Sequence, residues 1–255
     1  TSPEYHMKRL LAAGAGDIFQ VCKVFRDHER GRVHSPEFTM VEWYRLNIDH
    51  HGLMDDVERL LQHLIGDPVL RADSVRLSYR DAVMTCTGID PLAATTDDLT
   101  ECSRKHGFLP DHTAGLRLAD WLDLVFVSRV VPTLEPDRLT FIYDYPAALA
   151  ALARVRRDTA AVAERFEVFC GDLELANGFH ELADSREQRR RFEEDRSIRK
   201  QAGMPSLQPD ERFLAALDAG LPDCSGVALG FDRVLMLAAG TDDIRTTLTF
   251  PLATA

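Results

Sequence analysis

Several features that define common protein classes are missing from this sequence. The five cysteines, Cys22, Cys86, Cys102, Cys170 and Cys224, are scattered and include no Cys-x-x-Cys pair, so neither a disulfide framework nor a zinc site is predicted. Their pattern is typical of buried thiols in a reducing cytosol. No apolar run approaches the roughly 18 residues that a membrane span needs. We therefore expect a soluble, cytoplasmic protein with no membrane partner.

Positive charge is also scarce. Thirty lysines and arginines face 41 aspartates and glutamates, which gives a formal net charge of -11 and argues against binding nucleic acid through its phosphates. The sequence contains no His-Glu-x-x-His motif and no Gly-Lys-Ser/Thr phosphate loop, and His50 and His51 are expected in a solvated loop. Its 255 residues, 45% of them hydrophobic, can bury a sizeable core in one large or two small domains.

The pattern of apolar residues predicts an α+β fold. Helical spacing covers residues 52–65, and a charged helix capped by Asp184 covers 185–202. Strands without regular helix alternation indicate a mostly antiparallel sheet flanked by helices. Residues 66–138 look like a partly helical insertion, with helix candidates near 97–106 and 115–130. The predicted strands are 18–26, 37–45, 139–145, 162–170 and 173–179.

One segment near the end of the sequence, Gly226-Val-Ala-Leu-Gly-Phe-Asp-Arg233, favours ligand binding. Its glycines allow close approach of the backbone to a ligand. Arg233 precedes an apolar run that can form a buried helix, so it is placed to meet a phosphate. The alternative is a strand-turn-helix connection with a surface arginine.

Strand alternation places carboxylates on shared faces. Phe38, Glu42 and Tyr44 lie on one face of their strand, and a carboxylate on such an apolar face is either solvated at a sheet edge or used to bind an amine. A turn at Gly171-Asp172 would place Glu167 and Glu174 on one face of a hairpin. Two such carboxylates are either exposed or share a cation such as Mg²⁺.

These segments together resemble motifs 2 and 3 of the class II aminoacyl-tRNA synthetases, specifically the lysyl branch. Motif 2 corresponds to residues 24–44 and motif 3 to 226–237, and Glu174-Leu-Ala-Asn177-Gly-Phe-His-Glu181 resembles that branch's lysine pocket. The resemblance runs from Ser2 to Leu237 and is weaker over about 67–140. It implies one synthetase-like catalytic domain over 1–255 in a homodimer. The N-terminal motif 1 and the anticodon-binding domain are expected to be missing, with a truncated N-terminus.

The resemblance also implies roles for particular residues, with ATP and Mg²⁺ as cofactors. Arg26 and Arg233 would be catalytic, and Glu167 and Glu174 would hold Mg²⁺. Glu4 and Glu181 would stand at opposite ends of a diamino acid; because Glu181 follows Glu174 by seven positions, their convergence needs a strand irregularity, expected at Gly178. ATP would contact Arg26, Asp27, His28, His34, Ser35, Phe38, Glu174, Leu175, Gly230 and Arg233; the amino acid would contact Ser2, Pro3, Glu4, Glu42, Tyr44, Asn177, Glu181 and Ala228.

Departures from the lysyl-tRNA synthetase pattern narrow the prediction. The usual Arg-x-Glu of motif 2 is replaced by Arg26-Asp27-His28, with Glu29 one place later. Ala228 stands where glycine is usual, and its methyl group would crowd the α-amino group of lysine. Together with Met204-Pro, Pro222-Asp-Cys-Ser-Gly226 and Glu42-Trp-Tyr44, this alanine resembles the stand-alone paralogues that attach (R)-β-lysine to a lysine of elongation factor P. The alternatives are a truncated synthetase that charges tRNA with lysine, which is less favoured, and an inactive paralogue that binds an amino acid.

Overall fold

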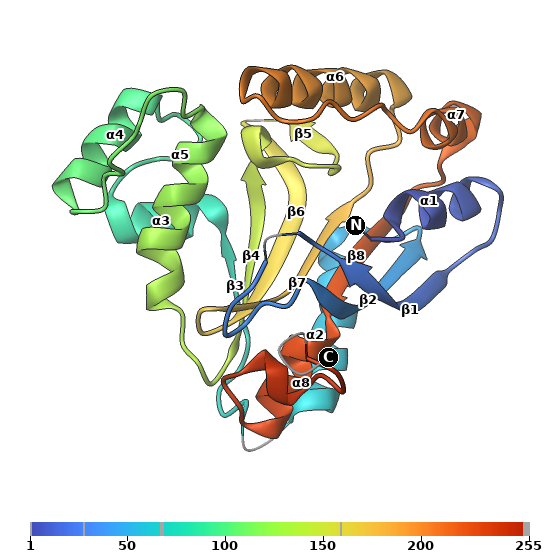
Figure 1. The fold of residues 1–255 in the computed structure, drawn as a ribbon, viewed down its shortest axis with the longest axis horizontal. Coiled ribbons are helices and arrows are strands. Elements are labelled where there is room, and N and C mark those ends of the chain that lie inside the picture. Colours follow the sequence, from blue (N-terminus) through green and yellow to red (C-terminus); the bar gives the residue numbers. More distant parts are fainter. Residues whose placement is uncertain (1, 28, 67–68, 159, 252–255) are drawn as a thin grey trace.

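A single twisted sheet organises the molecule (Figure 1). The computed structural model describes residues 2–27, 29–66, 69–158 and 160–251. Its eight strands run in the order β1-β2-β8-β7-β6-β4-β3, and β5 pairs with β6. Neighbouring strands pair antiparallel, except that β3 pairs parallel with β4. The strands are β1 Ile18–Phe25, β2 Glu37–Leu46, β3 Val75–Ser78, β4 Leu139–Pro146, β5 Val155–Arg157, β6 Ala161–Cys170, β7 Leu173–His180 and β8 Cys224–Gly230.

The helices flank this sheet, so the predicted α+β class is confirmed. All five predicted strands are present with bounds within one residue of the prediction, and the helices expected over 52–65 and 185–202 are present as α2 and α6. The helices are α1 Glu4–Ala12, α2 His50–Ile65, α3 Tyr79–Thr87, α4 Thr96–Lys105, α5 Leu118–Val125, α6 Ser185–Gln201, α7 Glu211–Gly220 and α8 Phe231–Ala239, with shorter turns at Phe126–Val130, Val131–Thr133, Ala147–Leu149 and Ile244–Thr246.

One face of the sheet is covered by α2 and α8, which lie together below it in Figure 1. The side chain of Asp49 accepts a hydrogen bond from the Gly52 amide and caps the first turn of α2. The apolar stripe of α2, which includes Leu53 and Val57, packs against Val227 and Leu229 of β8. Because side chains alternate along a strand, the residues between these, Gly226, Ala228 and Gly230, face the other side.

The other face is covered at its two ends. Near β2 and β8, α1 and α7 pack on Tyr44 and Cys224 through a small apolar cluster. Near β4 and β6, the helices α3 and α5 pack on residues such as Tyr145 and Phe169. These helices stand on opposite sides of the sheet centre in Figure 1. The middle of this face is left to polar side chains of β2, β7 and β6.

Residues 66–138 are more closely joined to the sheet than expected. The helices predicted near 97–106 and 115–130 are confirmed as α4 and α5, the latter continuing into a π-helical turn at Phe126–Val130. The prediction missed β3, which extends the sheet, and α3, which follows it directly. Ser78 ends β3 and caps α3 by accepting from the Asp81 amide. The segment therefore supplies an edge strand as well as helices.

The β6–β7 hairpin forms around Gly171-Asp172, as predicted, and pairs Phe169 with Glu174. The irregularity expected at Gly178 is wrong in position. It lies three residues earlier, because Val168 pairs with Ala176 and leaves Leu175 as an extra residue in β7. This bulge reverses the alternation between Glu174 and the rest of β7. Glu174 can therefore use the same face as Asn177, Phe179 and Glu181.

Gly178 serves close packing instead, which gives a testable prediction. A Cβ atom added there would lie 2.6 Å from Cζ of Phe166 and 2.9 Å from Cβ of Val227. Gly178→Ala should therefore lower the free energy of unfolding by about 1–3 kcal/mol, the usual range for an overpacked core. Urea denaturation measures this change. Gly230→Ala is the control, because its nearest added contact is 3.6 Å and its stability should hold; equal losses in both variants would contradict the packing argument.

Two observations concern the cysteines and the helices of the described part of the chain. All five cysteines are free thiols, and Cys102, Cys170 and Cys224 are buried. None of the described helices combines the length and apolar character that a membrane-crossing helix requires. Burial raises the pKa of the Cys170 thiol to about 11 and that of the Cys224 thiol to about 12. These thiols are accordingly uncharged core side chains.

Candidate active site

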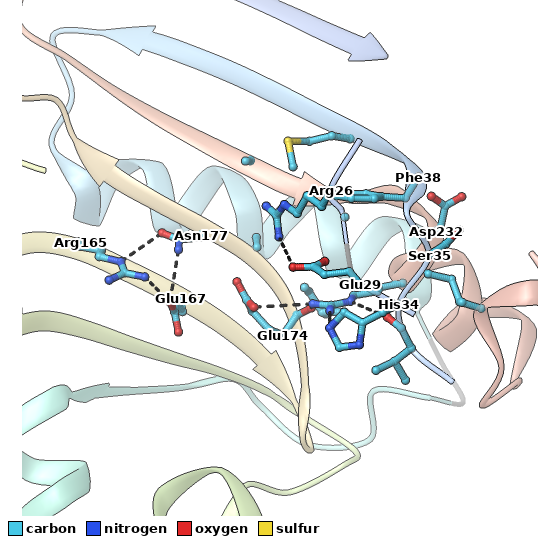
Figure 2. A pocket seen from close by; sticks show the side chains of 18 residues that line it. Arg26, Glu29, His34, Ser35, Phe38, Arg165, Glu167, Glu174, Asn177 and Asp232 are labelled. Atoms are coloured by element: carbon cyan, nitrogen blue, oxygen red, sulfur yellow. Dashed lines mark hydrogen bonds and ion pairs between the residues drawn. The ribbon is translucent and has the colours of Figure 1, made fainter. Parts of the chain in front are cut away.

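A cavity of about 320 Å³ opens on the polar middle of the sheet face (Figure 2). It is bounded by strands β2, β6, β7 and β8, by the β1–β2 loop and by the start of α8. Figure 2 places Arg165, Glu167 and Asn177 at one end and Arg26, Glu29, Phe38 and His34 at the other. The lining residues are Arg26, Glu29, Val33, His34, Ser35, Phe38, Met40, Arg165, Glu167, Glu174, Leu175, Ala176, Asn177, Ala228, Gly230, Asp232, Arg233 and Ile244.

Arg233 is fixed in the first turn of α8. Its Nη1 atom donates to the backbone oxygen of Glu174 at 2.7 Å, and its Nη2 atom lies 2.9 Å from Nε2 of His34. Burial and then the neighbouring guanidinium lower the pKa of His34, so the ring is neutral and Nε2 can accept from Arg233. The side chain of Arg233 remains 20% exposed. The guanidinium therefore presents positive charge to the cavity, and its position is fixed by contacts with β7 and with the β1–β2 loop.

Arg26 reaches the cavity from the end of β1. Its guanidinium carbon lies 5.3 Å from the centroid of the Phe38 ring, and Nη1 lies 3.7 Å from Oε1 of Glu29. A guanidinium over an aromatic ring forms a cation–π contact. Phe38 is held by β2, whose Thr39 amide donates to the buried Asp232 carboxylate at 2.5 Å. The flat ring of Phe38 and the cationic side chain of Arg26 therefore lie side by side in the cavity.

The β1–β2 loop brings only some of its predicted residues to the cavity. Ser35 is 8% exposed and lines the wall beside His34. Asp27 is exposed and is not among the lining residues, so its predicted contact with ATP is not supported by the geometry. His28 lies outside the described residues. Glu29 lines the cavity and pairs with Arg26.

Glu167 is held by donors from three strands. Its Oε1 accepts from Arg165 Nη2 and from Asn177 Nδ2, and its Oε2 accepts from the Tyr145 hydroxyl at 2.7 Å. Arg165 also donates from Nη1 to the Leu149 carbonyl oxygen at 2.7 Å and stacks over the Tyr145 ring. This network fixes the Glu167 carboxylate, and the Arg165 guanidinium balances its negative charge.

Glu174 is less well neutralised. Partial burial and then the nearby Glu167 carboxylate raise the pKa of Glu174 above its ordinary value, and Nη1 of Arg233 lies 3.6 Å from its Oε2 atom. Its side chain is 41% exposed, so a ligand can reach the carboxylate. Among the described residues, no group of three or more His, Cys, Asp or Glu side chains could hold a metal ion. The two carboxylates nevertheless fit Mg²⁺, which takes few protein ligands when phosphates and water complete its shell.

A second polar cluster lies on the same sheet face, beyond Ala228. Oε1 of Glu42 accepts from the Tyr44 hydroxyl at 2.5 Å. Nζ of Lys8 lies 2.6 Å from Oε1 of Glu4 and 2.5 Å from Oε2 of Glu181. Lys8, Glu42, Tyr44 and Glu181 are each 4% exposed or less, whereas the Glu4 side chain is 23% exposed. Burial raises the pKa of Glu42 to about 7 and that of Glu181 to about 8.

The prediction that Glu4 and Glu181 stand at opposite ends of a ligand is wrong in this structure. Both carboxylates contact the same ammonium group, that of Lys8, so they meet on one side of the pocket. The sequence argument treated the two acids as separate sites and did not include the lysine between them. Burial raises the pKa of Glu42 overall. The side-chain hydrogen bond between Ser2 and Glu42 acts in the opposite direction, as the smallest contribution after those of burial, Tyr44, Glu4 and Lys8. Pro3 begins α1 and so orients Glu4.

Strand β8 joins the cavity to the second cluster. Ala228 pairs with Glu42 on one side and Asn177 on the other, and Asn177 pairs in turn with Glu167. Ala228 and Asn177 line the cavity. Two residues along β8, a Cβ atom on Gly226 would lie 2.3 Å from the Tyr44 ring and 2.5 Å from Oε1 of Glu181. Only glycine therefore allows these side chains to close over the strand.

Four charged residues of the site, Arg165, Asp232, Glu29 and Lys8, were not in the predicted set, although the sequence carried signals for each. Arg165 alternates with Glu167 on β6 and so shares its face. Asp232 precedes Arg233, and Glu29 follows Arg26 within the loop. Lys8 lies four positions after Glu4 on a helix whose buried residues are Met7, Lys8 and Leu11. A lysine on a buried stripe with a glutamate at that spacing indicates an internal ion pair.

Comparison with known proteins agrees with this geometry. The sequence matches the family described as tRNA synthetases class II (D, K and N) over residues 1–254. It is 47% identical over 255 residues to an elongation factor P–(R)-β-lysine ligase of Haemophilus influenzae strain PittGG, covering 100% of this chain and 77% of that protein.

Two further relatives carry the same name. The ligase of Proteus mirabilis strain HI4320 is 48% identical over 252 residues, covering 99% of this chain and 76% of that protein. The ligase of Klebsiella pneumoniae strain 342 is 49% identical over 250 residues, covering 98% and 76%. The family match spans nearly the whole sequence, and these identities are high over most of each relative. The chain belongs to the class II tRNA synthetase family (D, K and N).

Proposed function

We propose that the protein activates (R)-β-lysine with ATP to form an aminoacyl-adenylate and transfers the β-lysyl group to a lysine of elongation factor P. The observation that carries this proposal is one sheet face with an arginine-lined cavity beside a cluster of Lys8, the buried Glu42 and Glu181 and the partly exposed Glu4. The family consists of ATP-dependent amino-acid ligases, and the named activity of three relatives agrees with the proposed acceptor.

The first step needs positioning rather than a general base. An amino-acid carboxylate is already ionised at neutral pH, and its oxygen attacks the α-phosphorus of ATP while the bond to the pyrophosphate oxygen breaks. Arg26 would bridge the attacking carboxylate and the α-phosphate, and Arg233 would hold the distal phosphates. Mg²⁺, bound by Glu174 with Glu167, would supply positive charge to the leaving pyrophosphate.

The nucleotide would lie on the motif 2 and motif 3 side of the cavity. Phe38 offers its ring to the adenine base, while the backbone of Leu175 and Gly230 allows close approach. His34 and Ser35 would close the loop over the phosphates, and Glu29 is added here as a nucleotide contact because it lines the cavity beside Arg26. His28 and Asp27 remain predictions from the family alone.

The second cluster would receive the amino groups of the substrate. Glu4 and Glu181 contact the single ammonium of Lys8, and the Glu42 carboxylate interacts with Glu4 and Lys8 electrostatically. The excess of negative charge fits a diamino acid better than an amino acid with one ammonium group. Within the described part of the chain, Oε1 of Glu181 is buried with no hydrogen-bond partner. A substrate ammonium in this place would satisfy it.

In the second step, the uncharged Nζ of the acceptor lysine attacks the carbonyl carbon of the adenylate. An amide bond forms, the bond to AMP breaks, and the amine nitrogen loses a proton. A tRNA acceptor is the second candidate, which the resemblance to lysyl-tRNA synthetases favours. The net charge of -11 supports the protein acceptor over tRNA. An inactive, amino-acid-binding paralogue is the third candidate; the cationic cavity favours catalysis over it.

Pyrophosphate exchange with α-lysine and with (R)-β-lysine tests the proposal. The methyl group of Ala228 lies between Glu42 and Asn177, where it would crowd an α-amino group. We expect β-lysine to support exchange with a kcat/KM about tenfold higher, the usual scale for one misplaced carbon in a pocket. A mass increase of elongation factor P, and none of tRNA, should follow. A preference for α-lysine with charging of tRNA would instead establish the second candidate.

Three further proposals rest on the family. We propose that residues 1–255 act as one catalytic domain, that the protein is cytoplasmic, and that it forms a homodimer. The edge strand β1 supports the dimer, because Phe19 is 77% exposed and Val21 is 54% exposed on one face of that strand. Exposed apolar side chains on an edge strand favour contact with another chain.

A further inference from the structure

Lys8 is a buried cation that the proposed reaction does not itself use. It lies on α1, and its side chain is 1% exposed. Its ammonium contacts Glu4 and Glu181 and lies 5.0 Å from the centroid of the Phe179 ring and 5.9 Å from that of Phe213. The contacts therefore come from α1, β7, α7 and the residue that follows β7. A side chain with these contacts joins α1 to the sheet at the edge of the proposed amino-acid pocket.

An apolar residue at this position would be the simpler solution for folding. The neighbouring buried residues of α1, Met7 and Leu11, are apolar and pack with Phe213. A buried ion pair costs several kcal/mol of desolvation per ion and often adds little stability over a packed apolar side chain. The presence of a lysine here is better explained by what it does to the carboxylates than by stability.

Those carboxylates need a counter-charge. Glu181 is 1% exposed, and its ionised form is unfavourable in such a site without a cation. Lys8 contacts Oε2 of Glu181 and leaves Oε1 without a partner among the described residues. One oxygen is thus fixed, and the other faces the Gly226 position, where a Cβ atom would lie 2.5 Å away.

We propose that Lys8 is a positioning residue: it favours the ionised form of Glu181 and holds Glu4 and Glu181 in a fixed orientation, so that the pocket recognises the ammonium groups of a diamino acid. With Glu42, these groups comprise three acids and one base, which leaves an excess of two negative charges when all are ionised. That excess matches two ammonium groups. The inference deepens the proposed function and rests on it.

The pKa shifts of Lys8 and Glu181 have the directions that this role requires. Burial lowers the pKa of Lys8, but the Glu181 and Glu4 carboxylates together raise it above its ordinary value, so Lys8 stays charged. Burial raises the pKa of Glu181 to about 8, while Lys8 acts to lower it. Removal of Lys8 should therefore raise the pKa of Glu181 further, and ionisation of the pocket should require a higher pH.

Lys8→Met tests the inference by its pH dependence. We expect the KM for the amino acid to rise about tenfold near pH 8 and further towards pH 6.5, while the KM for ATP changes less than about twofold. Lys200→Met, at an exposed position of α6, is the control and should leave both values unchanged. Equal increases in both KM values, or an unchanged pH profile, would overturn the inference.

The double variant Lys8→Met/Glu181→Gln guards against a folding defect. Removal of both charged partners should be tolerated better than removal of one. If Lys8 acts through Glu181, the double variant should have the amino-acid KM of Glu181→Gln alone, with little added effect. If the two effects multiply instead, Lys8 acts independently and the inference fails.

Titration of the Glu181 carboxyl carbon by NMR, without substrate, separates this inference from the proposed function. Lys8→Met should shift that titration to higher pH. Should the unmodified protein fail to exchange pyrophosphate with either lysine, the proposed function fails, and the titration still decides whether Lys8 controls Glu181. An unshifted titration would overturn the inference even in an active enzyme.

Discussion

Replacing Arg233 with alanine is expected to lower kcat for pyrophosphate exchange about 100- to 1000-fold, the usual loss when one preorganised charge-stabilising group is removed. The reason is geometric. The guanidinium is held by the Glu174 carbonyl oxygen and by His34, so it is in place before the phosphates arrive. A lysine cannot reproduce these contacts because it lacks the planar fork of donors. Arg233→Lys should therefore recover only a small part of the activity.

Arg189→Ala provides the matched control for this prediction. Arg189 lies on α6, is exposed and pairs with Glu211 at 2.8 Å, so its loss removes one arginine and one ion pair far from the cavity. Its exchange rate should equal that of the unmodified protein. Because Arg233 also joins two elements, the melting temperature of each variant must be measured. A folded Arg233→Ala protein with an exchange rate within threefold of normal would contradict the assignment.

Glu181→Gln is expected to raise the KM for the amino acid about 10- to 100-fold and to leave the KM for ATP nearly unchanged. A hydrogen bond to a charged group contributes about 1.5–3 kcal/mol, which corresponds to this range. Glutamine keeps the shape of the side chain and can still accept from Lys8. The change therefore removes charge from the pocket more than it removes packing.

Glu164→Gln is the control for Glu181→Gln. Glu164 is also buried, at 7% exposed, and lies 2.8 Å from Nδ1 of His180. It faces the opposite side of the sheet from Arg165, so it shares burial and ion pairing with Glu181 but has no place in the site. Steady-state exchange with varied ATP and varied amino acid separates the two KM values. Equal changes in both for Glu181→Gln would show that the pocket is misassigned.

Local patterns in the sequence predicted the strands well. Alternation is a local property, so it placed Phe38, Glu42 and Tyr44 on one face of β2 without knowledge of the neighbouring strand. The hairpin turn placed Glu167 and Glu174 together for the same reason. The bulge at Leu175 could not be placed, because it depends on pairing between two strands. Gly178 carries the expected signal, but its lack of a side chain serves packing against Phe166.

The site was predicted in part. The resemblance located both arginines and most of the cavity wall, but the position of Lys8 between two carboxylates depends on how α1 packs on the sheet. The burial of His50 was also not predicted, for a different reason. It was expected in a solvated loop, yet it is 1% exposed, begins α2 and lies 3.3 Å from Asp144. The capping residue Asp49 was the signal for a helix start there, and the buried partner comes from a distant strand.

The extra residue in β7 sets a rule for how this site can change over evolution. A single substitution can change the proposed phosphate-binding part of the site or the proposed amine-binding part without affecting the other. An insertion or deletion of a single codon between positions 174 and 181 would turn the Glu181 carboxylate, which we propose binds an amine, towards the hydrophobic interior, although each motif would still be recognisable. The spacing between the motifs is therefore as much a part of the catalytic machinery as the motifs themselves.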